Sequence, residues 1–288
     1  MPDDVVLHET KGNVAYITLN RPEVLNAMTD AMLDSVLGGI RRAEEDDDIK
    51  CVVIRANGRS FSSGWDLEEI GRMYGIADVK SGERSRRPPQ RNGLNLDRRR
   101  SEKFAAILLS MKTTIAQVHG YCFGAAWMIP LVCDFVIASD DATFAHTEQR
   151  LGASGTMWTL PLVIMHCGPK KARELLLSGR DFDAAEAERL NLINRVVPAD
   201  KLQEEVDALT QAICLLPRDG LAIGKAFTNV TYDSLNMLSP FLQYSAVHPL
   251  IVGMKWAPDE VSFPKERRDM GSREAARKRA ERFPEGYR

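Results

Sequence analysis

The sequence lacks a charge excess of either sign, a paired-cysteine motif and a long apolar run. Its 38 Lys and Arg residues nearly balance 40 Asp and Glu residues, so the net charge of −2 creates no overall field that would attract nucleic acid or an anionic membrane. No apolar run reaches the roughly 18–20 residues that a membrane-spanning helix needs. Residues 1–4 lack the basic-then-apolar pattern that opens a secretory signal. We therefore expect a cytoplasmic protein with no membrane partner.

Cysteine is scarce and scattered. The chain has five cysteines, and no two of them form a CxxC pair. Neither a zinc site nor a disulfide framework is therefore indicated, and free thiols in a reducing compartment are expected. The five residues are Cys51, Cys122, Cys133, Cys167 and Cys214.

Strand and helix patterns alternate along the first part of the chain. Residues 13–19 form a short run of β-branched and aromatic residues that is typical of a strand. Residues 27–45 carry apolar residues at helical spacing, with Thr29 or Asn26 as the expected N-cap. Residues 51–55 form a continuous apolar run, as expected of a strand that is buried on both faces.

The same alternation continues to about residue 215 and then stops. After residue 217 no strand is expected, and the charged tail at 265–282 is expected to be partly helical. The pattern predicts an α/β core followed by a helical appendage. Further strands are expected at 115–118, 135–138 and 142–145, and further helices at 103–111, 170–178, 184–190 and 201–215.

Two glycine-containing loops follow predicted strands and suit a site that binds through the backbone. In the first, residues 58–67, Gly64 lets a ligand approach the main chain, and the Trp65 amide follows it. In the second, residues 119–126, a glycine turn leads into a helix, and the first N–H groups of a helix have no partner within it. Two such donors that converged on one point would form an oxyanion hole.

A series of motifs resembles the enoyl-CoA hydratase/isomerase (crotonase) superfamily. The series opens with ITLNRPEVLNAM at residues 17–28, which is similar to the start of that family. Several further motifs follow in the family's order: FSSGWDL at 61–67, HGYCFGAA at 119–126, CDFVIA at 133–138, ATF at 142–144, LSG at 177–179 and LINRVVP at 192–198.

The resemblance implies an α/β fold with a β-spiral core of ββα repeats. On this basis we expect residues 1–198 to form the core with the coenzyme A site, and residues 199–288 to form a helical trimerisation region. The resemblance also implies a homotrimer or hexamer, an acyl-CoA thioester as the substrate, and no metal or redox cofactor.

The resemblance also assigns roles to individual residues. The Trp65 and Ala125 amides would form the oxyanion hole that holds the enolate oxygen, and Glu148 would be the single acid/base. A further set of residues would lie along the coenzyme A moiety: Leu25, Ala27, Asp66, Leu67 and Glu68.

The sequence departs from the family's hydratases at one catalytic position. Those hydratases use two glutamates; the first position is Met128 here, and only the second, Glu148, is retained. Family members with a lone glutamate at this second position include Δ3,Δ2-enoyl-CoA isomerases and a hydratase-lyase. The alternatives are thus isomerase chemistry, hydratase or lyase chemistry, and a catalytically reduced paralogue that binds acyl-CoA or RNA.

Residues 71–101 interrupt the pattern with glycines and prolines and are expected to form an irregular basic insertion. Residues 84–100 contain seven Arg and one Asp. Three interpretations stay open: a solvated loop, contacts with the phosphates of coenzyme A, and RNA binding through residues such as Arg98, Arg99 and Arg100. The segment 84–100 contains no aromatic residue on which bases could stack, so nucleic acid is the least favoured partner.

Overall fold

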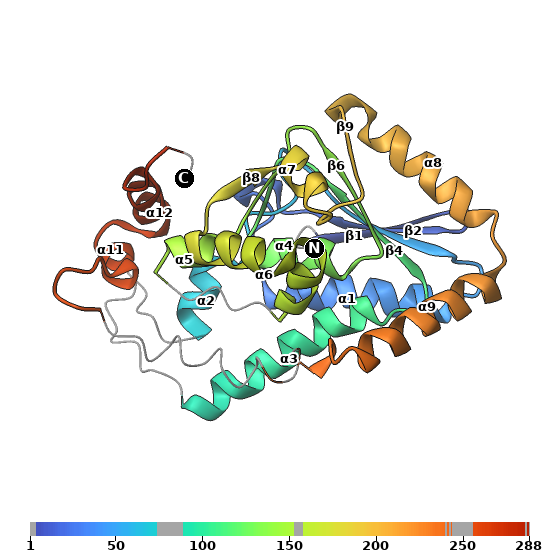
Figure 1. Ribbon diagram of the computed structural model, residues 1–288, viewed down its shortest axis with the longest axis horizontal. Helices are drawn as coiled ribbons and strands as arrows, with labels where there is room; N and C mark the ends of the chain where they lie inside the picture. The colour runs from blue at the N-terminus through green and yellow to red at the C-terminus, as the bar shows by residue number, and fades with distance from the viewer. Residues whose placement is uncertain are drawn as a thin grey trace.

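The chain folds into two β-sheets surrounded by helices (Figure 1). The computed structural model describes residues 4–73, 89–152, 158–239 and 256–285, together with residues 241, 243 and 287. Strands and helices alternate up to residue 214, and only helices follow in the described residues beyond it. The α/β class and the helical C-terminal part are therefore confirmed.

The larger sheet has six strands in the order β1-β2-β3-β4-β6-β9. The first pair, β1 and β2, is antiparallel, and each later pair is parallel. Because β3 and β4 are parallel neighbours, the loops that follow them leave the same edge of the sheet. The strands are β1 (Val6–Lys11), β2 (Val14–Leu19), β3 (Cys51–Ala56), β4 (Thr113–Val118), β6 (Phe135–Ser139) and β9 (Arg195–Val197).

Both faces of the central strands of this sheet are buried against helices. Val52 and Ile54 point into the larger core, which contains residues of α1, α3 and α4, whereas Cys51 and Val53 point into a second core with α8. This explains why β3 reads as a continuous apolar run. The bounds are α1 (Asp30–Glu45), α3 (Gln90–Leu108), α4 (Ala125–Val132) and α8 (Leu202–Cys214).

The smaller sheet has three strands, β5 (Tyr121–Phe123), β7 (Thr143–Ala145) and β8 (Asp181–Asp183), in that order. Three rings pack against one another beside it. The Trp127 ring centroid lies 5.0 Å from that of Phe144 and 5.6 Å from that of Phe182. These contacts fix α4, which carries Trp127, against β7 and β8.

The remaining helices lie around the sheets. In Figure 1 the α8–α9 end of the molecule lies opposite the end that holds α11 and α12. None of the described helices is long and apolar enough to cross a membrane. The bounds are α2 (Leu67–Met73), α5 (Thr147–Arg150), α6 (Leu160–Ser178), α7 (Ala184–Arg189), α9 (Arg218–Ser234), α11 (Phe263–Met270) and α12 (Ser272–Glu281), with 3-10 turns at Pro22–Val24 and Ala199–Lys201.

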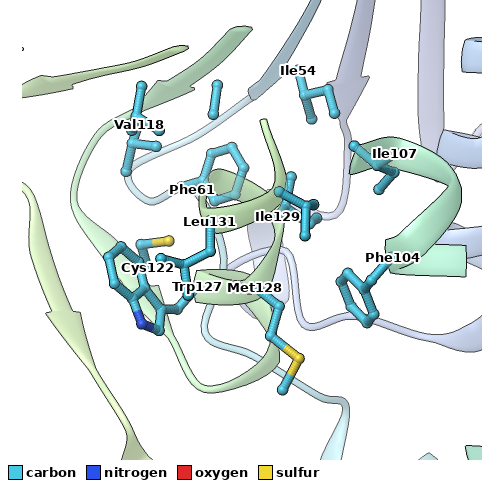
Figure 2. Packing of buried hydrophobic residues seen from close by; sticks show 14 of the residues in the cluster. Ile54, Phe61, Phe104, Ile107, Val118, Cys122, Trp127, Met128, Ile129 and Leu131 are labelled. Carbon is cyan, nitrogen blue, oxygen red and sulfur yellow. The ribbon is translucent and has the colours of Figure 1, made fainter. Parts of the chain in front are cut away.

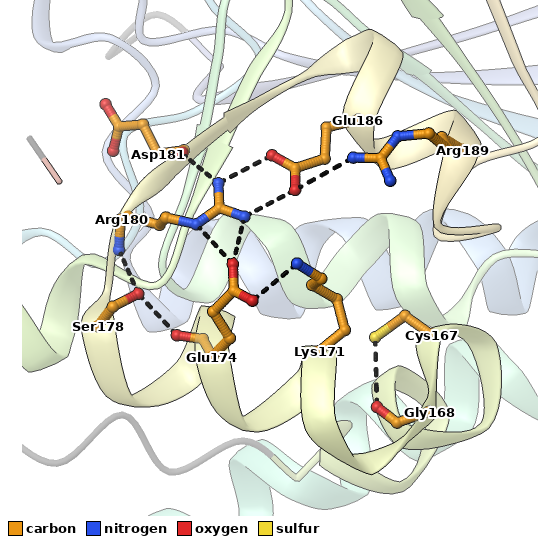
Figure 3. Close-up of polar contacts among 9 residues, drawn as sticks. All are labelled: Cys167, Gly168, Lys171, Glu174, Ser178, Arg180, Asp181, Glu186 and Arg189. Atoms are coloured by element: carbon orange, nitrogen blue, oxygen red, sulfur yellow. Dashed lines mark hydrogen bonds and ion pairs between the residues drawn. The ribbon is translucent and has the colours of Figure 1, made fainter. Parts of the chain in front are cut away.

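Arg180 joins α6 to α7 through two carboxylates. Its guanidinium donates to Glu174 Oε1 at 2.8 Å and to both carboxylate oxygens of Glu186 at 2.6 and 2.8 Å (Figure 3). Hydrogen bonds from Arg180 hold the pKa of Glu186 below its usual range. Arg180 is therefore held by carboxylates from two helices.

The start of α3 was predicted too far along the chain. Residues 71–101 were expected to be irregular and a helix was expected from residue 103, but α3 begins at Gln90 and α2 extends to Met73. Arginines are good helix formers, and Gly93 is tolerated because it is buried within α3. Residues 74–88 lie outside the described residues.

Thr29 is the N-cap of α1, as expected: its hydroxyl accepts a hydrogen bond from the Met32 amide at 3.1 Å. One of the two caps proposed from the sequence is therefore confirmed. Asn26, the other candidate, has a different role that is described below.

We predict that the buried thiols of the native protein resist alkylation. Burial raises the pKa of Cys51 and Cys133 to about 12, and that of Cys122 well above its usual range. A thiol with a pKa near 12 is only about one ten-thousandth ionised at pH 8, and the thiolate is the nucleophile. Iodoacetamide labelling followed by peptide mass spectrometry should show slow reaction at these three residues and fast reaction after unfolding in urea. Equal rates in both states would contradict the prediction.

Candidate active site

The first loop is fixed by a backbone bridge to the segment before α1. The Met28 amide donates to Gly64 O at 2.7 Å, and the Asp66 amide donates to Met28 O at 2.8 Å. In such a parallel bridge the residue between the two contacts turns its own N–H the other way. The Trp65 N–H therefore points away from Met28, and it makes no backbone hydrogen bond within the described part of the chain.

Asn26 ties the same two segments together. Its side-chain amide donates to Asn57 O at 2.8 Å and to Ser60 O at 2.9 Å, and its Oδ1 accepts from the Arg21 amide. It is fully buried and has a positive φ of 52°, which asparagine tolerates better than most residues. The asparagine of the LNAM motif thus holds the loop and does not cap α1.

The second loop ends at the start of α4. The chain leaves β4 through Gly120, forms β5, and turns at Gly124, the N-cap of α4 with a φ of 54°. The Ala125 N–H is the first amide of α4, so no carbonyl of its own helix accepts it. The N-cap is a glycine, which has no side chain of its own to accept these N–H groups.

Gly64 brings the two loops into contact. A Cβ on Gly64 would lie 2.7 Å from Phe123 O and 3.6 Å from Ala125 N, and the φ of Gly64 is 93°. Only glycine fits there, because the main chains themselves are in contact. The close approach at Gly64 therefore brings the segment that carries the Trp65 amide next to the start of α4 at Ala125.

The Glu148 carboxylate lies against this second loop. A Cβ on Gly124 would be 2.5 Å from Glu148 Oε1 and 3.3 Å from Oε2. His146 Nδ1 lies 3.2 Å from Glu148 Oε2, and within the described residues His146 Nε2 is buried with no hydrogen-bond partner. The structure thus brings Trp65, Ala125 and Glu148 together.

Gly179, from the LSG motif, packs against the backbone of the segment that carries Glu148. It ends α6 with a φ of 63°, and a Cβ on it would lie 2.8 Å from His146 O. A larger residue here would push on the short turn that carries Glu148. This explains the physical need for glycine at this position.

Met128 lies in the core and carries no acid/base group. It is buried in α4, whose eight residues are all buried. Figure 2 shows Met128 among Phe104, Trp127 and Ile129, with Phe61 of the first loop packed near Val118, Cys122 and Leu131. The same apolar cluster therefore anchors the helix start that carries Ala125.

The residues expected along coenzyme A lie in the two bridged segments. Leu25 O accepts from the Ser63 amide at 2.9 Å, and Ala27 O accepts from Arg21 Nη1 at 2.6 Å. Asp66 Oδ1 accepts from the amides of Glu68 and Glu69, which caps the start of α2. The structure thus places Leu25, Ala27, Asp66, Leu67 and Glu68 in two segments that backbone hydrogen bonds join beside Gly64.

The basic segment divides into exposed and buried arginines. Arg98 and Arg99 are exposed and line a hollow of about 550 Å³ between α2 and α3. Arg100, which the sequence grouped with them as a phosphate or RNA ligand, is buried and its guanidinium pairs with Asp30. Arg100 is therefore not available to a nucleic acid. Its guanidinium carbon lies 4.3 Å from the Trp65 ring centroid, a contact that no sequence motif indicates.

Within the described residues no group of three or more His, Cys, Asp or Glu side chains is arranged to hold a metal ion. The groups that the structure brings together at the two loops are two backbone amides and one carboxylate. Such a group can bind an oxygen that gains negative charge while a proton moves nearby.

The chain is similar to known proteins over most of its length. The enoyl-CoA hydratase/isomerase family profile matches residues 9–238. A probable enoyl-CoA hydratase of Mycobacterium bovis is 32% identical over 237 residues, which is 81% of this chain and 84% of that protein. A probable mitochondrial enoyl-CoA hydratase of Dictyostelium discoideum is 29% identical and covers 78% of this chain and 75% of its own.

The crystal structure of an enoyl-CoA hydratase/isomerase from Xanthobacter autotrophicus Py2 matches with a TM-score of 0.84 and 31% identity, over 98% of this chain and 99% of that one. A probable enoyl-CoA hydratase from Mycobacterium smegmatis matches with a TM-score of 0.76 and 29% identity, over 86% and 93% of the two chains. The crotonase fold expected from the motifs is therefore confirmed.

We predict that Gly64→Ala destabilises the protein more than Gly12→Ala does. Gly12 also has a positive φ, 56°, but a Cβ there meets nothing within 4 Å. The control should therefore cost only the conformational penalty of about 1–2 kcal/mol. Gly64→Ala adds the collision with Phe123 O. Urea unfolding of both variants measures the difference, and equal losses of stability would mean that the two loops do not approach as described.

Proposed function

Because the chain belongs to the enoyl-CoA hydratase/isomerase family, we propose that it is an enzyme that acts on an acyl-CoA thioester and stabilises its enolate. The observation that supports the proposal is the close approach of Gly64 to Phe123 O and Ala125 N, with the Glu148 carboxylate against Gly124. Two fixed donors stabilise the charge that develops on the thioester oxygen, and loss of one such donor typically costs about 3 kcal/mol of barrier height.

The proposed reaction uses one carboxylate. Glu148 takes a proton from C2 of a 3-enoyl thioester, and the electron pair moves onto the thioester oxygen, where both amides donate to it. Glu148 then returns the proton to C4 and the double bond moves to C2–C3. No atom is gained or lost, and Met128 does not need to contribute.

Hydration is the second candidate. The curated relatives reported above are named as probable enoyl-CoA hydratases, and His146 Nδ1 contacts Glu148 Oε2. In this reaction Glu148 would deprotonate a water that adds at C3, and the proton would be delivered to C2 of the enolate. A water with only one carboxylate to orient it should react more slowly than in a site with two.

The coenzyme A part of the substrate is proposed to lie along the two segments that contain Leu25, Ala27 and residues 66–68. Within the described residues the carbonyl oxygens of Leu25 and Ala27 each accept one hydrogen bond, which leaves a lone pair for an amino group of the ligand. The five free thiols suit the reducing conditions of the cytoplasm, which is the compartment we propose.

We also propose that the protein assembles into a homotrimer or hexamer through α9. Exposed apolar side chains recur at Ile223, Phe227 and Val230, which is the spacing of one helix face. Phe227 is 72% exposed, and Leu215 in the turn between α8 and α9 is 87% exposed. A stripe of this kind is typical of a surface that a second chain covers.

We predict that Glu148→Gln lowers turnover at least about 100-fold but leaves thioester binding intact, because general acid–base catalysis contributes about 10²–10⁴-fold. The assay offers 2-enoyl, 3-enoyl and aromatic enoyl thioesters and follows the products by mass spectrometry. Glu204→Gln, an exposed glutamate on α8, is the matched control and should retain wild-type turnover.

The products of this assay separate the candidates. Double-bond migration without a change of mass identifies an isomerase, and a gain of one water identifies a hydratase. A Glu148→Gln variant with full turnover would contradict the role of Glu148. Tight binding without turnover by the wild type would favour the catalytically reduced paralogue.

We predict that Phe227→Asp dissociates the oligomer, because a charge in the centre of an apolar interface is costly to desolvate. Sedimentation equilibrium should give a lower mass for this variant than for the wild type. Thr228→Asp, one residue away on α9, is the control and should keep the wild-type mass. Unchanged mass for Phe227→Asp would place the interface elsewhere.

A further inference from the structure

His146 is a buried histidine that contacts the carboxylate of Glu148. Its side chain is 5% exposed, and its Nδ1 lies 3.2 Å from Glu148 Oε2. Its other ring nitrogen, Nε2, is buried and has no hydrogen-bond partner within the described residues. A buried polar atom without a partner is uncommon and costs free energy, so it calls for a physical explanation.

The unpartnered Nε2 indicates which ring nitrogen carries the proton. A neutral imidazole has one N–H donor and one acceptor nitrogen, whereas the charged ring has two donors. A proton on Nε2 would bury a donor without a partner, and in the neutral ring it would also turn the lone pair of Nδ1 toward a carboxylate oxygen. A proton on Nδ1 instead donates to Glu148 Oε2 and leaves only one lone pair unused. The geometry therefore favours a neutral His146 that donates from Nδ1.

The main chain around His146 is anchored on both sides. β7 ends at Ala145, and this strand pairs with β5 on one side and with β8 on the other. Ala145 O also accepts from the Gly124 amide at 2.8 Å, which ties the end of β7 to the second loop. His146 O packs against Gly179, where a Cβ would lie 2.8 Å away. The ring of His146 therefore projects from a fixed backbone.

Glu148 lies in the four-residue helix α5, and its side chain is 23% exposed. A glutamate side chain has three rotatable bonds, so contacts must select one orientation of its carboxylate. The two carboxylate oxygens face different groups: Oε2 faces His146, and Oε1 is the oxygen nearer to Gly124. A donor on Oε2 thus selects the orientation in which Oε1 lies against Gly124, the residue before Ala125.

We propose that His146 is a positioning residue whose Nδ1–H donates to Oε2 of Glu148 and so directs Oε1 toward the reacting carbon of the substrate. The inference rests on the proposed function, since it assumes that Glu148 moves a proton of a thioester. A general base works only within hydrogen-bond reach of the proton that it takes, so a carboxylate turned away from the site reacts slowly. The histidine itself touches no reacting atom.

The test compares His146→Asn with His146→Leu. The two new side chains have nearly the same shape, but only asparagine keeps an N–H donor at the place of Nδ1. The double variant His146→Leu/Glu148→Gln shows whether the two residues act together. His8→Leu is the matched control, because His8 Nε2 also lies within hydrogen-bond distance of a side chain, 3.1 Å from Ser35 Oγ, but on the edge strand β1.

We expect His146→Leu to lower kcat at least about 10-fold with less than about a 2-fold change in KM, because a misdirected base slows the chemical step and leaves binding intact. His146→Asn should stay within about 3-fold of the wild-type kcat, because the donor is kept. The double variant should be no slower than Glu148→Gln alone, because the donor has no effect once the base is gone. His8→Leu should retain the wild-type kcat and KM.

A second measurement examines the ring without substrate. ¹⁵N NMR of protein labelled at histidine distinguishes a ring nitrogen that carries a proton from one that does not, and the His146 signals are those that disappear in His146→Asn. We expect a proton on Nδ1 at the pH of the assay. A ring that carries its proton only on Nε2 would overturn the inference, and this result decides alone if His146→Leu does not fold.

Three kinetic results would also overturn the inference: equal losses of kcat in His146→Asn and His146→Leu, full turnover by His146→Leu, or additive losses in the double variant. Each would show that the histidine only fills space beside Glu148. A wild-type protein that converts no thioester would instead refute the proposed function, and the inference with it.

Discussion

The candidate site depends on one constraint: the chain is so crowded at Gly64 and at Gly124 that neither position has room for a side chain. Gly64 lies against Phe123 O, and Gly124 lies against the Glu148 carboxylate. The hydrogen bonds of Asn26 and the bridge at Met28 bring the first segment to this contact, and the apolar anchoring of α4 brings the second. The loops can meet because they leave adjacent parallel strands at one edge of the sheet.

Much of the fold follows from local patterns that are strong along the chain. β3 has a continuous apolar run because helices cover both of its faces, and α1 has helical spacing and a threonine cap. Strands β5 and β8 have only three residues each, which is too short for an alternating pattern to be recognised. They form because tertiary contacts such as that between Phe144 and Phe182 hold them in place.

The residues of the site likewise fall into two groups: some lie in recognisable local motifs, and others depend on contacts between distant parts of the chain. Its glycine loops and Glu148 lie in motifs whose order along the chain is readable, so their positions could be predicted. Arg100 could not, because its burial depends on Asp30, which is 70 residues away, and an arginine in a basic run is normally exposed. Gly179 shows the opposite case, since the motif was visible but its contact with the backbone of His146 was not.

Burial of the ion pair between Arg100 and Asp30 costs desolvation free energy. Desolvation of two charges offsets most of their attraction, and well-packed apolar residues of similar volume often stabilise a protein as well or better. Added stability therefore gives little reason for this pair beside Trp65. An apolar side chain would pack on the indole in many orientations, whereas a planar fork fixed by two carboxylate oxygens has one. What the pair provides is therefore one fixed arrangement of α1, α3 and the Trp65 ring rather than added stability.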